Sequence, residues 1–126
     1  MADHFRLSKY QLFTNGVMTG TNVLTSPAIH ILNLDNVYIQ LDFTGTPVGT
    51  FQVQVSGDHV EDQQGNVVVA GHWISLALSP APVAAGAALD IGIDCNQLGA
   101  PYVRVVYTNA SGVGVLNGFV SGKGLM

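Results

Sequence analysis

The chain has 126 residues, of which 48% are hydrophobic and only 10% are charged, whereas a typical soluble domain is about 25% charged. This balance excludes intrinsic disorder, which needs low hydrophobicity and high charge. With four basic residues and a net charge of −4, the chain has too few cations to track nucleic-acid phosphates, so nucleic acid is not expected as a direct partner.

The length is that of a single domain, and no apolar run is long enough for a transmembrane helix. The N-terminal segment carries Asp3, Arg6 and Lys9 and has no apolar stretch of the signal-peptide kind, so we expect synthesis in a cytoplasm. Cys95 is the single cysteine, which excludes an intrachain disulfide and favours a buried, inert thiol. Self-association, docking on a larger assembly or a large two-sheet core would each explain the low charge.

The hydrophobic pattern has a period of two, which is typical of antiparallel strands with one buried face. Residues 1–27 are interpreted as an N-terminal arm, or as an edge strand plus a loop with one short strand near Val23. Residues 28–126 are interpreted as one sandwich domain. Strands are expected over Lys9–Thr14, Ala28–Leu32, Val37–Phe43, Thr50–Ser56, His72–Leu78, Leu89–Cys95, Tyr102–Thr108 and Val113–Ser121.

Turn residues separate these strands. The segments 44–49 and 109–112 are short enough for hairpins. Residues 79–88 are interpreted as a crossover between sheets or as a short helical turn over 84–88, and Gly118 as a β-bulge that changes the phase of the last strand. About eight short strands predict an all-β fold, a single antiparallel β-sandwich of jelly-roll type with an N-terminal arm.

The densest polar cluster is the segment 58–62, in which the candidate metal ligands are Asp58, His59, Glu61 and Asp62. Carboxylates and imidazole ligate Ca²⁺ and transition metals, but the segment lacks the glycine-spaced pattern of calcium loops. A solvated hairpin end is therefore the favoured interpretation, and no metal or cofactor is expected. His72 begins the next predicted strand and would be able to approach His59.

No catalytic constellation is present, so we expect that the protein is not an enzyme. Asp90 and Asp94 share a strand face but lie roughly 13 Å apart along it, too far for a glycosidase pair. Arg104 is expected to form an ion pair with Asp42 or Asp90. Four aromatic residues are candidates for stacking on a sugar or at an interface; they are Tyr38, Trp73, Tyr102 and Tyr107.

Three stretches, LDNVYIQLDFTGTPVGTFQVQVSGD, WISLALSPAPVAAG and LGAPYVRVVYTNASGVGVLNGFVSGKG, resemble small β-sandwich structural proteins from the virion gene clusters of tailed bacteriophages. The resemblance covers about 29–124, and its most specific parts are residues 45–50 and 101–108. It implies a head decoration (cement) protein, a head fibre or a tail component, with no catalytic residue carried over. Met1–Pro27 lies outside it.

These observations predict a decoration protein on the capsid exterior, docked across subunits of the major capsid protein and assembled into the virion in the host bacterial cytoplasm. Contacts are expected from the N-terminal segment and the apolar loop near residue 80, through Phe5, Tyr10, Leu12, Phe13, Pro80, Pro82 and Val83. Other virion proteins are further candidate partners. A homo-oligomer such as a trimer fits this interpretation, and no membrane contact is expected. The alternative is a jelly-roll carbohydrate-binding module of a phage fibre or adhesin, which a glycan array would distinguish.

Overall fold

The computed structural model describes residues 5–31, 36–78, 81–96 and 100–125, with side chains over 9–31, 36–78, 81–95 and 100–122. Twelve strands lie in these ranges, more than the eight predicted, and the predicted all-β sandwich is confirmed. One sheet has four strands in the order β1-β12-β4-β10: β1 (Phe5–Met18), β12 (Gly114–Leu125), β4 (Asn36–Gly45) and β10 (Leu89–Asn96).

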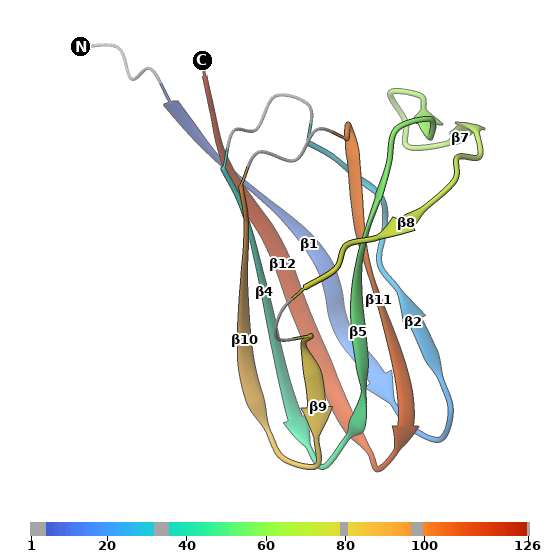
Figure 1. The fold of residues 1–126 in the computed structure, drawn as a ribbon, viewed down its shortest axis with the longest axis vertical. Coiled ribbons are helices and arrows are strands. Elements are labelled where there is room, and N and C mark those ends of the chain that lie inside the picture. Colours follow the sequence, from blue (N-terminus) through green and yellow to red (C-terminus); the bar gives the residue numbers. More distant parts are fainter. Residues whose placement is uncertain (1–4, 32–35, 79–80, 97–99, 126) are drawn as a thin grey trace.

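The second sheet has six strands and is built around β11 (Tyr102–Ser111) and β5 (Val48–Ser56). The short strands β2 (Val23–Thr25) and β3 (Ile29–His30) pair with β11. The short strands β8 (Ile74–Ser75) and β9 (Val83–Ala85) pair with β5. A separate hairpin of β6 (Val60–Glu61) and β7 (Val67–Val69) lies beyond one end of the two face-to-face sheets (Figure 1).

The chain passes from one sheet to the other at most connections, which is the jelly-roll arrangement. The two predicted hairpins are wrong, because β4 and β5 lie in different sheets, as do β11 and β12. A short gap between alternating strands is equally compatible with a turn between sheets. The two turns pack together, since the Thr46 N–H donates to the Val113 carbonyl at 2.8 Å, and Gly112, at φ 74°, lies against the Thr46 carbonyl.

The core lies between the sheets and is built from every second residue of the long strands. In β4, Val37, Ile39 and Leu41 are at most 1% exposed, while Tyr38 and Asp42 face outward. Their counterparts across the core are supplied by the second sheet. The almost fully buried members there are Val53, Val103, Val105 and Tyr107.

The N-terminal segment forms the edge strand β1, which pairs with β12 along most of its length. Two register shifts interrupt that pairing, between Gln11 and Phe13 and between Phe13 and Gly16. The predicted bulge at Gly118 is wrong, because β12 pairs with β4 without interruption. The irregularity lies in β1 instead, where Phe13 pairs with Gly118. A side chain at Gly118 would collide with Leu41 and the Gln40 carbonyl of β4.

The apolar segment after residue 80 contains a strand, so the predicted helical turn over 84–88 is wrong. β9 pairs with β5, and the chain then enters β10 in the other sheet. The alternative interpretation, a crossover between sheets, agrees with this path. No helix among the described residues is long and apolar enough to cross a membrane.

Candidate functional site

The four candidate metal ligands between Asp58 and Asp62 are divided among separate contacts. Asp58 pairs with His72 Nδ1 at 2.6 Å, and it accepts hydrogen bonds from the His72 N–H at 2.8 Å and from Ser56 Oγ at 3.0 Å. The His72 hydrogen bonds hold the pKa of Asp58 well below its usual range. The same contact raises the pKa of His72. This exposed pair fastens the loop after β5 to the segment that leads into β8.

His59 is buried, although it belongs to the same segment. Its Nε2 lies 2.8 Å from Glu61 Oε2, and the Gly71 N–H points at its Nδ1 at 3.4 Å. Because Nδ1 accepts the hydrogen bond from Gly71, the proton of the neutral ring is on Nε2, and Nε2 donates a hydrogen bond to the Glu61 carboxylate. The ring packs against Trp73 and Tyr102, with centroids 5.2 and 5.1 Å away. His59 therefore anchors the β6–β7 hairpin to the sandwich.

Asp62 caps the turn of this hairpin. Its Oδ1 accepts from the N–H groups of Gln64 and Asn66, both at 2.9 Å. These bonds, the one from Asn66 foremost, lower the pKa of Asp62. Within the described residues no three His, Cys, Asp or Glu side chains come together as metal ligands would. The segment is the solvated hairpin end that the sequence favoured, with one histidine folded into the core.

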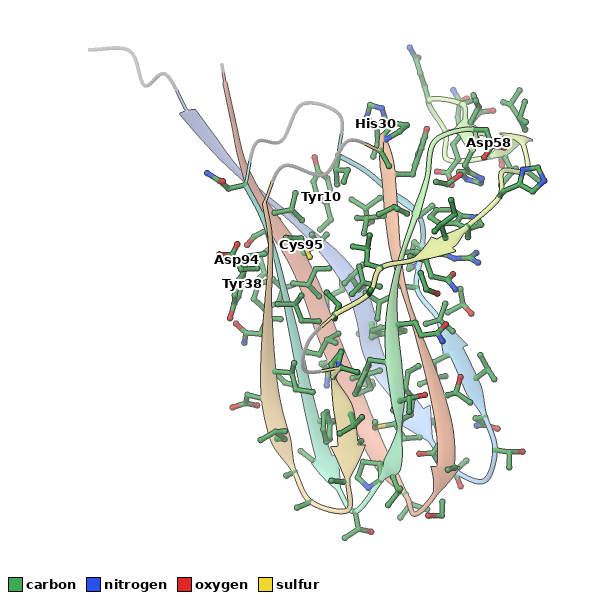
Figure 2. The ribbon with its side chains drawn as sticks, in the orientation of Figure 1. Tyr10, His30, Tyr38, Asp58, Asp94 and Cys95 are labelled. Carbon is green, nitrogen blue, oxygen red and sulfur yellow. The ribbon has the colours of Figure 1, made fainter. Side chains whose placement is uncertain are left out.

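The predicted aromatic residues do not gather on one surface. Tyr107 is fully buried, and Tyr38 lies on the outer face of the four-stranded sheet, where it points away from the core near Asp94 (Figure 2). Trp73 and Tyr102 both contact the His59 ring. An open groove of about 300 Å³ lies beside this cluster, at the end of the sandwich; it is lined by His30, Glu61, Asp62, Gln63 and Tyr102.

Arg104 stacks on Trp73, with its guanidinium carbon 4.2 Å from the ring centroid, and its Nε donates to Gln54 Oε1 at 2.8 Å. The predicted ion pair with Asp42 or Asp90 is wrong, since those carboxylates lie on the other sheet. The sequence pattern identified the outward face of each strand, but it did not indicate to which of the two sheets each strand belongs.

Two of the predicted partner-binding residues are core residues. Leu12 and Phe13 are 4% and 6% exposed, because β1 is part of the four-stranded sheet and turns both side chains inward. Tyr10 is 43% exposed and Val83 44%, and Pro82 is half-buried. The Phe5 side chain and Pro80 lie outside the described residues.

An apolar groove of about 510 Å³ runs between the β9 segment and β10. It contains Pro82 and Val83, and a second groove of about 370 Å³ shares these residues. β10 is an edge strand that pairs with β4 on one side. The groove is lined by Leu78, Ala81, Pro82, Val83, Leu89, Ile91, Gly92, Ile93 and Asp94.

A second apolar surface was missed by sequence reasoning. The β6–β7 hairpin exposes four valines, which we call the valine hairpin: Val60, Val67, Val68 and Val69, between 44% and 63% exposed. Ile74 in nearby β8 is 67% exposed. The run of valines after a Gln-Gln-Gly-Asn turn was the available signal. Contiguous exposed apolar side chains of this kind mark interaction surfaces.

No family model and no curated protein matches the chain, but solved structures share its fold. A chain of infectious bursal disease virus, Gx strain, superposes with a TM-score of 0.53 at 11% identity, over 98% of this chain and 32% of that one. The VP2 subviral particle of the same virus superposes with a TM-score of 0.51 at 8% identity, over 98% of this chain and 33% of that one. The SPBc2 prophage-derived protein YomS gives 0.51 at 8% identity, over 97% of this chain and 98% of YomS.

The chain thus spans about a third of the bursal disease virus chains and nearly the whole of the prophage protein. At these identities the likeness concerns the fold. That fold is a β-sandwich which also occurs in proteins of a virus and of a prophage.

Proposed function

We propose that the chain is a structural virion protein of a tailed bacteriophage, namely a capsid decoration or cement protein that docks on the major capsid protein lattice and stabilises the head. The observation that carries this proposal is the superposition on the prophage-derived protein YomS, which spans nearly all of both chains. The jelly-roll topology supports it, because capsid proteins commonly use this architecture.

The polar side chains of the Asp58–Asp62 segment support a non-enzymatic role. Asp58 holds His72, His59 holds Glu61, and Asp62 caps a turn, so each is engaged in fixing a loop. A general base or nucleophile needs its reactive atom directed at a substrate. These groups instead build a rigid support for the hairpin that they flank.

The valine hairpin is the surface that we propose for docking on the lattice. It projects from one end of the sandwich (Figure 1), and its exposed valines gain free energy when a partner covers them. A small contact per copy suffices on a repeating lattice, because many copies or several contacts per oligomer act together.

The test is the copy number of this polypeptide in purified virus particles from the source culture, measured by quantitative mass spectrometry against the major capsid protein. We expect a copy number comparable to that of the capsid protein. A handful of copies per particle would assign the protein to a fibre or tail instead, and absence from the particles would refute the virion role.

The groove beside Tyr102 favours carbohydrate binding in a phage fibre or adhesin as a second candidate function. An aromatic ring, two carboxylates and an amide line it, through Tyr102, Glu61, Asp62 and Gln63. Tyr102 is only 8% exposed, so the polar side chains would supply most of the contacts to a sugar. A glycan array with the purified chain tests it, and a Gln63→Ala variant should lose any signal that arises in this groove.

A further inference from the structure

The two edges of the four-stranded sheet are suited to each other. The edge strands are β1 and β10, and each pairs on one side only among the described residues. All three pairings in the order β1-β12-β4-β10 are antiparallel, so β1 and β10 run in opposite directions. A second copy placed beside the first in the same orientation therefore brings its β1 antiparallel to β10, and the ladder continues across the contact.

The charges of the two edges are opposite. Three of the four basic residues of the chain, Arg6, Lys9 and Lys123, belong to β1 and its neighbour β12. The Lys9 ammonium lies on the outer face, 4.1 Å from the centroid of the Phe119 ring. At the other edge, the outer face carries carboxylates and no basic residue of β4 or β10.

Two of those carboxylates repel one another. Asp90 lies directly opposite Asp42 in the ladder, and Asp94 lies two outward positions further along β10, beyond Gly92. Like charges directly opposite in a sheet are destabilising. A contact of two β10 edges would double this repulsion, and a contact of two β1 edges would bring Lys9 against Lys9. Only the unlike edges attract, which disfavours a two-fold contact between like edges and favours a head-to-tail one.

The inner faces of the two edges also match in shape. Tyr10 stands opposite the buried Val120 and so belongs to the inward row of β1, yet 43% of it is exposed. Beside β10, the same inward side is hollowed by the apolar groove of about 510 Å³. The regular part of β1, before its first register shift, is Phe5–Gln11.

We propose that copies of this chain associate head to tail, with β1 of one copy pairing antiparallel to β10 of the next. Setting Phe5–Gln11 against Asp90–Asn96 places Lys9 opposite Gly92, between Asp90 and Asp94. Lysine reaches such diagonal neighbours. The same register places Tyr10 opposite Ile91, at the apolar groove of the next copy. A heterologous contact of this kind gives a ring if its rotation closes and a filament if it does not.

The experiment is sedimentation of the purified chain over a range of concentrations and salt. We expect concentration-dependent association that weakens with added salt. Lys9→Glu should raise the dissociation constant by about tenfold or more, because like charges facing across a contact are strongly unfavourable. Tyr10→Ser should weaken association at unchanged fold. Thr108→Glu, which introduces the same acidic side chain on the exposed face of the other sheet, is the control and should have no effect.

Charge reversal tests the pairing itself. Asp94→Lys alone should weaken association, and Lys9→Glu with Asp94→Lys in one chain should restore part of it. Positions 9 and 94 then again carry unlike charges, while the unchanged Asp90 keeps the recovery incomplete. A monomer at all concentrations, an unaffected Lys9→Glu variant or a double variant weaker than both single variants would overturn the proposal. Circular dichroism confirms that each variant folds. The association belongs to the isolated chain and holds whether or not the chain is found in virus particles.

Discussion

At the scale of single residues, the packing around Gly49 leaves no room for a side chain. A Cβ there would collide with the Thr108 carbonyl and the buried Tyr107 ring. We expect Gly49→Ala to lower the free energy of unfolding by about 1–3 kcal/mol, the usual cost of overpacking a core. Chemical denaturation measures it. Gly57→Ala is the control, because nothing lies within 4 Å of its added methyl group; an equal loss in both variants would contradict the steric explanation.

The Asp42–Asp90 pair makes stability depend on pH. The hydrogen bond between the two carboxyl groups and the charge of Asp42 raise the pKa of Asp90 above its ordinary value. The stabilisation from the shared proton is therefore complete below the unfolded pKa and is lost as the pH rises through the folded pKa. Asp90→Asn keeps a donor at all pH values, so we expect this variant to melt at a higher temperature than the parent protein near neutral pH.

The same difference should shrink as the pH is lowered below about 3, where Asp90 binds its proton in both the folded and the unfolded state. Melting curves of dilute protein across this range measure it. An advantage of the variant that is independent of pH would refute the shared proton. The Asp58–His72 pair has a different window: its contribution is lost as the pH falls through the lowered pKa of Asp58 or rises through the raised pKa of His72.

At the scale of elements, the valine hairpin carries the proposed contact with the capsid. Burying one valine side chain is worth roughly 1.5–3 kcal/mol, so we expect Val68→Asp to weaken capsid binding about tenfold or more. Co-sedimentation with undecorated capsids measures this. Val113→Asp is the matched control, because Val113 is similarly exposed but lies in the turn at the opposite end of the sandwich. Equal losses would place the contact elsewhere.

The sequence predicted the long strands well and their partners poorly. Alternation reveals which face of β4 is buried, because Val37, Ile39 and Leu41 all point inward. It contains no information on whether the turn over 44–49 joins strands of one sheet or of two. Short strands such as β9 were missed because three residues are too few to show a period.

The candidate site shows the same limit. Spacing grouped Asp58, His59 and Asp62, but it did not reveal that His59 turns into the core and pairs with Glu61 there. Leu12 and Phe13 were predicted to contact a partner from an N-terminal arm, because an edge strand and a free arm have the same apolar composition. The contacts that decide between these alternatives are made by residues further along the chain, namely Gly71 for His59 and Gly118 for Phe13.

At the scale of the whole molecule, the pairing of β1 with β12 has a consequence for biosynthesis. β1 leaves the ribosome well before β12, its one partner in the described sheet, because the other strands lie between them in the chain. Contacts between such distant segments form slowly, because a long loop must close first. The nascent chain therefore carries β1 unpaired until β12 has been made, and we expect this strand to be the part that a chaperone must shield during translation.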